Sequence, residues 1–253
     1  MYGIEVRDAS KSFEAGAGTS VTALAGVSVT VRPGEFLAIV GHNGSGKSTL
    51  LRAIGGELHL DSGSVTLVDE AEGRNWPAAR ATPTTVARVF QDPNRGTFPR
   101  LTVFENMRMA VMQSRPSVLR RAITDTYRDE TTSRLSGVGL DQKGESRAQD
   151  LSGGQRQMLA IEMAFVAAPK LLLLDEHTAS LDRANEQRCM SATASAARAQ
   201  GITLAMVTHN LSHAIEYSDR ILVLQLGEVV ANLAEGDKAR VGVQELARLC
   251  GYF

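Results

Sequence analysis

Two glycine-containing turns in this 253-residue chain have the composition of phosphate-binding loops. The first, GHNGSGKS, runs from Gly41 to Ser48 and fits the pattern GxxxxGK followed by Ser or Thr. It lies between the apolar run FLAIV and the helical pattern STLLRAIGG, which is the strand–turn–helix context that such a loop requires. The second, LSGGQ at 151–155, also precedes an apolar run with helical character. The chain therefore presents two candidate anion sites.

The first turn can bind phosphate through its backbone. Its glycines let successive N–H groups point inward, and the N-terminus of the following helix adds positive potential. Lys47 can reach the β- and γ-phosphates, and the Ser48 hydroxyl can ligate Mg²⁺. These residue types leave ATP, GTP and other phosphoesters open. The residues expected to bind the ligand are Gly41, His42, Asn43, Gly44, Ser45, Gly46, Lys47, Ser48 and Thr49.

The run LLLLDE at 171–176 predicts a buried strand that ends in two acids. At such an end, Asp175 can hold Mg²⁺ through water, and Glu176 can act as general base on an attacking water. Two adjacent acids can also form a solvated strand end. The four leucines favour the buried strand and hence the metal site.

Composition is that of a soluble globular protein, with 43% hydrophobic and 22% charged residues. A formal net charge of −1 does not favour nucleic acid as the main partner. Cys189 and Cys250 have no metal-ligand spacing, so we expect buried thiols in a reducing compartment. The chain begins without a signal-peptide pattern, and no apolar run approaches about 20 residues. We therefore expect a cytosolic chain that does not itself cross a membrane.

Hydrophobic periodicity predicts an α/β fold. Half-buried strands are expected from the alternation at 3–6, 27–31 and 63–68, and fully buried parallel strands at 36–40, 170–175 and 203–208. A Gly-rich stretch at 14–22 is typical of a surface loop. Helices are expected at 104–114 and 117–138, within a segment rich in Pro, Arg and Thr that we interpret as a helical insertion.

In chain order, GHNGSGKST, VFQDP, LSGGQRQ, LLLLDEHTASLD and MVTHN resemble the motifs of ABC transporter ATP-binding subunits, and the resemblance covers essentially the whole chain. It implies a single ABC ATPase domain over 1–253. A RecA-like P-loop NTPase core with an N-terminal antiparallel β-subdomain would occupy 1–92 and 156–253, and an inserted helical subdomain with the signature motif would occupy 93–155. The cofactors implied are ATP and Mg²⁺.

The resemblance also explains the second turn. In this family the signature loop of one subunit caps the γ-phosphate on the P-loop of another, so the chain would pair with a second copy or with a homologous ATPase subunit. Ser152 would offer a hydroxyl, and the following glycines would allow close approach. A plain helix N-cap is the alternative for Ser152. The signature residues implied are Ser152, Gly153, Gly154 and Gln155.

Further roles carry over by position. Gln91 matches the Q-loop glutamine, His209 the switch histidine that holds the general base, and Asp182 the D-loop acid at the dimer interface. The alternatives are a surface glutamine, a structural histidine and an N-cap. Phe13 is the candidate for stacking on adenine, with core packing as its alternative. The catalytic set is thus Glu176, His209, Gln91 and Lys47, and the metal set is Ser48, Gln91 and Asp175.

Two departures from the family pattern stand out. His177 follows the catalytic acid where Pro is usual, and Glu162-Met163 replace the usual Ala-Arg of the signature helix. His177 can alter a nearby pKa or be a loop residue of a subgroup, and we favour the loop residue. The phrases QDPNRGTFPRLTVFENM and DEHTASLD are similar to a bacterial subgroup that works with a periplasmic binding protein and a separate permease.

The function implied is an ATPase at the cytoplasmic face of the bacterial inner membrane that drives import of an amino acid or another small solute. A permease would dock near Gln91 and the 94–107 segment, and a solute-binding protein would take part indirectly. One alternative is a soluble ABC ATPase of an assembly system such as iron–sulfur cluster biogenesis. Another is a P-loop kinase, which would have no use for LSGGQ.

Overall fold

The computed structural model describes residues 2–14, 19–69, 72–82, 84–114, 123–179, 181–238 and 240–252. The strands are β1 (Tyr2–Glu14), β2 (Ser20–Val31), β3 (Phe36–Val40), β4 (Ser62–Asp69), β5 (Arg74–Pro77), β6 (Val86–Val89), β7 (Leu171–Asp175), β8 (Thr203–Val207), β9 (Arg220–Gln225) and β10 (Glu228–Leu233). The helices are α1 (Lys47–Ile54), α2 (Val103–Ser114), α3 (Asp125–Ser136), α4 (Gly153–Val166), α5 (Arg183–Gln200), α6 (Leu211–Tyr217), α7 (Glu235–Lys238) and α8 (Val243–Leu249).

The central sheet has six strands in the order β10-β9-β3-β8-β7-β6, of which only β10 pairs antiparallel. All residues of β3 and β8 are buried, as are the four leucines of β7. Parallel strands covered on both faces read as continuous apolar runs, so the three buried strands predicted from sequence are confirmed.

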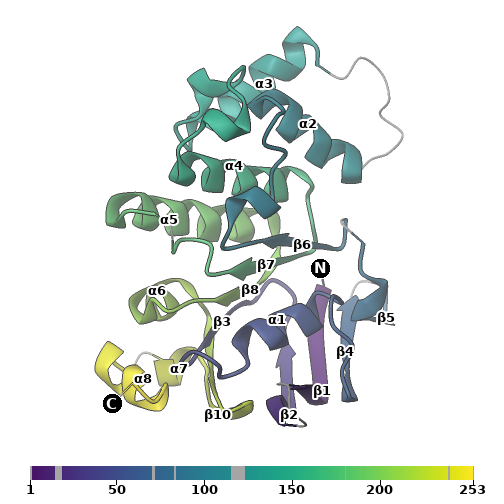
Figure 1. Cartoon of the computed structure of the whole chain (residues 1–253), viewed down its shortest axis with the longest axis vertical. Coiled ribbons are helices and arrows are strands. Elements are labelled where there is room, and N and C mark those ends of the chain that lie inside the picture. Colours follow the sequence, from purple (N-terminus) through teal and green to yellow (C-terminus); the bar gives the residue numbers. More distant parts are fainter. Residues whose placement is uncertain are drawn as a thin grey trace.

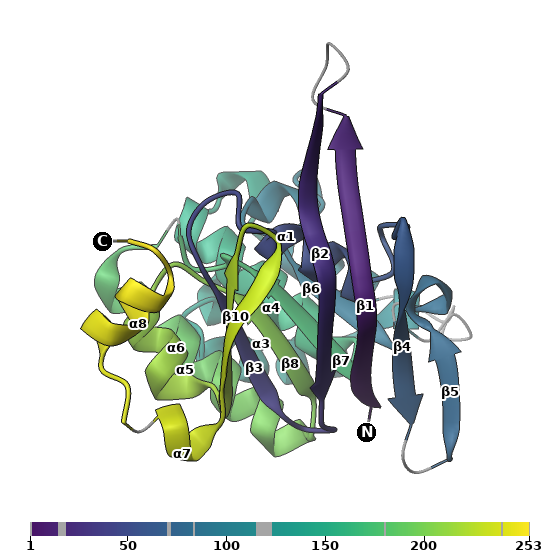
Figure 2. The ribbon, with the colours of Figure 1, turned by 90° about the horizontal axis from the view of Figure 1, so that it is seen from below.

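A second sheet, entirely antiparallel, has the order β2-β1-β4-β5. Helix α1 lies between it and the central sheet (Figures 1 and 2). Leu50 and Leu51 of α1 share one apolar core with Ile4 of the second sheet and Leu173 of the central sheet. The antiparallel sheet therefore braces the helix that follows the first glycine turn.

The Gly-rich loop predicted at 14–22 is shorter in the structure. Residues 20–22 belong to β2 and pair with 12–14, because Val21 and Thr22 are β-branched and find partners across the hairpin. Residues 15–18 of that loop lie outside the described ranges. So do residues 115–122, which include the start of the helix predicted at 117–138; its later part is α3.

Helices α2, α3 and α4 form a layer above the central sheet (Figure 1). They share an apolar core of their own, which includes Met107, Leu135 and Leu159. Helix α4 also contributes Ile161 and Phe165 to the core that α5 and α6 share with the central sheet. One helix therefore joins the two parts mechanically.

Both cysteines are buried free thiols, as predicted. Burial raises the pKa of Cys189 to about 12 and that of Cys250 to about 11. Within the described ranges, no helix combines the length and apolar content needed to span a bilayer.

Candidate functional site

The turn between β3 and α1 is held tightly by its surroundings. Gly46, the N-cap of α1, has φ +101, and a Cβ there would lie 2.2 Å from the carbonyl oxygen of Ala23. At Gly41 a Cβ would lie 2.1 Å from the carbonyl oxygen of Leu224. Both positions require glycine because no side chain fits between the turn and the neighbouring backbone.

Lys47 projects back into this turn. Its Nζ donates to the carbonyls of Gly41 at 2.8 Å and His42 at 2.9 Å. The residue is only 5% exposed, and burial lowers the pKa of the ammonium, an effect that the Glu176 carboxylate opposes. The loop carbonyls therefore hold the Lys47 ammonium inside the turn, at the position expected for a bound phosphate.

A cavity of about 370 Å³ opens over the turn. It is lined by Phe13, Val21, Ala23, Asn43, Gly44, Ser45, Gly46, Lys47, Ser48, Thr49 and Glu176. Phe13 is 37% exposed at this cavity, and the Lys11 ammonium lies 5.6 Å from its ring centroid. An aromatic face is thus available beside the glycine turn, and its stacking role stays a prediction.

The two acids at the end of β7 face different partners. The Oγ of Ser48 lies 3.5 Å from Oδ1 of Asp175. Glu176 has a left-handed backbone with φ +47, and its Oε1 lies 2.6 Å from Nε2 of His209. A strained backbone at a strand tip is typical of functional sites. The structure therefore brings together four of the predicted residues at one edge of the sheet.

Gln91 follows β6 and is exposed. Among the described residues, no hydrogen bond joins its side chain to Ser48 or Asp175. The backbone beside it is anchored to α4, because the Gln157 side chain donates to the Phe90 carbonyl at 3.2 Å. The Q-loop is therefore tied to the helix that carries the second glycine turn, and the metal role of Gln91 stays a prediction.

The second turn is a capped helix start. Gln155 N donates to the Ser152 hydroxyl at 3.2 Å, and Ser152 N donates to Oε1 of Gln155 at 3.1 Å. Arg156 secures the preceding loop by donating to the carbonyls of Ala148, Gln149 and Leu151. Ser152 is an N-cap, as the alternative interpretation predicted, and residues 151–155 do not line the cavity over the first turn. The signature role of Ser152, Gly153, Gly154 and Gln155 stays a prediction.

Asp182 also caps a helix. Its Oδ1 accepts from the backbone N–H groups of Ala184 and Asn185, each at 3.1 Å. These hydrogen bonds lower the pKa of the Asp182 carboxyl, and the bond from the Asn185 N–H has the largest effect. The N-cap prediction is confirmed, and the interface role of Asp182 stays a prediction.

Arg88 of β6 was not predicted as a site residue. Its Nη2 lies 2.5 Å from Oδ2 of Asp175, and its Nη1 contacts Glu57. The Arg88 side chain is only 9% exposed. One sequence signal exists: a lone cation in the apolar run VARV must find an acid on a neighbouring strand. Arg88 thus fixes one oxygen of Asp175 and leaves Oδ1 toward Ser48.

His177 is buried, and its Nε2 makes no hydrogen bond with the described residues. Burial, followed by the nearby His213, lowers the pKa of His177 to about 3. The imidazole is therefore neutral near pH 7 and is packed inside the protein. It does not line the cavity over the first turn.

Known proteins share this arrangement. Residues 24–179 match the family model described as ABC transporter. The chain is 40% identical over 245 residues to a tyrosine transport ATP-binding protein of Clostridioides difficile, which covers 96% of each chain. It is 35% identical over 241 residues to the cell division ATP-binding protein FtsE of Streptococcus pneumoniae, covering 92% of this chain and 96% of FtsE.

Among solved structures, the fold is similar to the dimeric ATP-binding cassette MJ0796 in a post-hydrolysis state with ADP and phosphate. The TM-score is 0.75 at 27% identity, over 92% of this chain and 98% of that one. The α/β fold thus agrees with the solved cassettes, and the matched stretch 24–179 contains both the glycine turn and the end of β7. The chain belongs to the ABC transporter family, and it is an ATP-binding, ATP-hydrolysing subunit with the ABC ATPase fold.

Proposed function

We propose that two such subunits close around two ATP molecules at the cytoplasmic face of a membrane and drive solute import through a separate permease. One observation supports the proposed dimer. The cavity over the P-loop has no lining residue from 151–155, whereas Ser152 and Gly153 are exposed at the start of α4. A capped, outward-facing helix N-terminus can bind an anion held by another molecule.

The residues around the P-loop have distinct roles in this proposal. Lys47 exchanges its loop carbonyls for phosphate oxygens, Glu176 accepts a proton from the attacking water, and His209 holds Glu176 in place. The oxygens of Ser48 and Asp175 converge at 3.5 Å, and such an oxygen pair suits Mg²⁺. When bound there, Mg²⁺ would neutralise phosphate charge.

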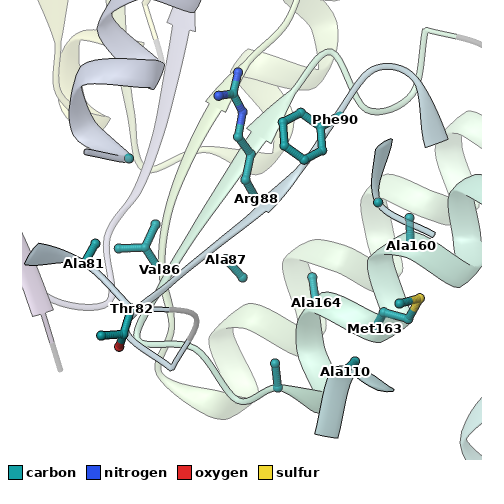
Figure 3. Close-up of a pocket in the computed structure, with 13 residues that line it drawn as sticks. Ala81, Thr82, Val86, Ala87, Arg88, Phe90, Ala110, Ala160, Met163 and Ala164 are labelled. Carbon is teal, nitrogen blue, oxygen red and sulfur yellow. The ribbon is translucent and has the colours of Figure 1, made fainter. Parts of the chain in front are cut away.

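The permease is proposed to dock in a groove of about 370 Å³ between the central sheet and the helical layer (Figure 3). Its walls are made mostly of small residues, including Ala87 of β6, Ala110 of α2, and Ala160 and Ala164 of α4. Phe90, next to Gln91, lies at one end. Such a groove accepts a bulky apolar side chain from a short cytoplasmic segment of the permease.

The groove can be tested by filling it. Ala167→Phe adds a phenyl group at the groove wall, so we expect lost co-purification with the permease and retained ATP binding. Ala199→Phe, on the exposed side of α5, is the control and should retain the permease. Equal permease recovery with both variants would argue against this docking site. A soluble assembly factor would instead be recovered without any polytopic partner.

An amino acid is the proposed solute because the chain shares 40% identity over nearly its whole length with a tyrosine transport ATP-binding protein. Solute choice lies in the permease and the binding protein. Uptake of labelled tyrosine and of other amino acids into proteoliposomes with the complete complex tests this point. ATP-dependent uptake of a different solute class alone would contradict it.

Glu176→Gln tests the hydrolytic role. The variant should bind ATP normally, lose turnover and accumulate as an ATP-bound dimer, because the amide cannot accept the proton of water. ATP binding, phosphate release and size-exclusion chromatography measure the three effects. Turnover near the wild-type rate would contradict the assignment of Glu176 as general base.

Ser152→Arg tests the shared site. It should leave ATP binding intact and abolish hydrolysis, because the damage falls on the neighbour's ATP. Mixing it with Glu176→Gln should restore part of the turnover, since each mixed dimer has one site with wild-type Glu176 and a wild-type signature turn. Two inactive variants that stay inactive when mixed would count against a site built from two chains.

A further inference from the structure

Helix α8 is fixed against the core of the central sheet. Leu246 of α8 and Cys250, which follows it, are fully buried in the apolar core that α5 and α6 share with the central sheet. The Gln225 side chain at the end of β9 donates to the Leu249 carbonyl at 2.7 Å. The packing of α8 therefore fixes where residues 250–252 leave the helix.

The chain reverses at Gly251, which has φ +76. After the reversal, Tyr252 N donates to the Ala247 carbonyl at 3.1 Å. A Cβ at Gly251 would lie 3.2 Å from Nε2 of Gln225 and 3.7 Å from Cδ2 of His42 in the P-loop. The turn thus brings Tyr252 to the P-loop from the side of α8.

The phenol of Tyr252 meets two groups of the site. Its hydroxyl donates to the Gly41 carbonyl at 3.2 Å and lies 3.4 Å from Nδ1 of His209. The opposite ring nitrogen of His209, Nε2, faces Glu176 at 2.6 Å. Burial, Cys250 and Glu176 raise the pKa of the phenol, so it keeps its proton near pH 7.

We propose that Tyr252 is a positioning residue for the switch histidine. It holds the imidazole of His209 at Nδ1 and ties it to the Gly41 carbonyl, so that Nε2 faces Glu176. The phenol has one proton. If it donates this proton to Nδ1, neutral His209 keeps its own proton on Nε2 and donates it to Glu176, and this is the arrangement that we propose for the working site. If it donates to the Gly41 carbonyl instead, Nδ1–H must donate to the phenol oxygen. This inference rests on the proposed roles of Glu176 and His209.

Tyr252→Phe removes the hydroxyl and keeps the ring. We expect kcat to fall about five- to tenfold, the effect of one neutral hydrogen bond, with KM and ATP affinity unchanged. Tyr127→Phe is the matched control, because the Tyr127 phenol donates to the Phe104 carbonyl at 3.1 Å in the helical layer. It should leave kcat at the wild-type value.

A readout independent of turnover comes from NMR of the protein with ¹⁵N-labelled histidines. The Nδ1 signal of His209, assigned with His209→Gln, should shift by several ppm in Tyr252→Phe and stay unchanged in Tyr127→Phe. An unchanged signal, an unchanged kcat, or a rise in KM alone would overturn the proposal. So would equal losses in both Tyr variants.

The outcome for Glu176→Gln distinguishes failure of the proposed function from failure of the role proposed for Tyr252. If that variant keeps its turnover, the proposed function of the Glu176–His209 pair fails. If it is inactive while Tyr252→Phe behaves as wild type, only the role of Tyr252 fails.

Discussion

The two glycine turns of this chain open helices in opposite ways. The P-loop turn ends at Gly46, an N-cap without a side-chain hydrogen bond, and its Ser45 and Lys47 are buried. The signature turn begins at Ser152, which forms a complete capping box and is exposed. The first turn is shaped by the surrounding backbone, whereas the second is satisfied locally and faces outward.

This difference matches the two roles proposed for the turns. A confined turn with uncapped N–H groups is suited to hold a ligand in its own chain. A turn that needs no support from the rest of the protein can be offered to another chain. If this is correct, substitutions in the P-loop half should reduce stability strongly, and those in the signature turn should reduce it weakly.

The largest effect is expected for Gly46→Ala. The added Cβ lies 2.2 Å from the Ala23 carbonyl at a φ of +101, so the backbone must move. We expect a loss of about 3 kcal/mol or more in unfolding free energy, together with loss of ATP binding. Chemical denaturation measures the first, and a wild-type midpoint would mean that the turn is not confined.

Arg88→Met should come next. It leaves the carboxylates of Asp175 and Glu57 without their cation, and breaking the largely buried pair with Asp175 costs about 3 kcal/mol. Both Arg88 and Arg95 lie over the Phe90 ring, with guanidinium carbons 4.9 and 4.4 Å from its centroid. Arg95→Met is the matched control, because Arg95 forms no ion pair among the described residues. Equal denaturation midpoints for the two variants would argue against the Arg88 ion pair.

His177 should give a pH effect of intermediate size. Burial moves its pKa from 6.5 to about 3, so the unfolded state binds the proton more readily between these values. Stability is therefore complete above pH 6.5 and decreases as the pH falls, by about 1.4 kcal/mol per unit. The loss should reach about 2 kcal/mol near pH 5, and His177→Gln should reduce this slope. An unchanged slope would mean that His177 titrates freely.

Ser152→Ala should have a smaller effect, about 1 kcal/mol, because it removes one half of the capping box. ATP binding by the isolated subunit should be unchanged. Thermal unfolding and nucleotide titration test the two parts. A loss as large as that of Gly46→Ala would remove the contrast between the turns.

Gly153→Ala should be the mildest for the fold, within about 0.5 kcal/mol, because nothing lies within 4 Å of the added Cβ. Hydrolysis in the dimer should nevertheless fall at least tenfold, since the added methyl blocks approach to the neighbour's phosphate. Full activity would show that this face does not contact ATP.

Some of the site followed from local patterns. The glycines of the P-loop, the four leucines before Asp175 and the apolar run before His209 predicted buried parallel strands with the site at their carboxyl ends. These patterns are informative because burial on both faces and a tight turn each restrict residue type locally. The hairpin at 20–22 was missed, because strand pairing depends on residues across the turn.

Local pattern thus specified the α/β core, the P-loop and the acidic strand end, since backbone conformation and burial of each segment are encoded within a few residues. Tertiary structure alone placed Arg88 on Asp175 and Tyr252 on His209, pairs that lie 87 and 43 residues apart. It also separated the signature turn from the P-loop cavity. Those relations depend on how strands order in a sheet and where helices pack, which no short stretch of sequence contains.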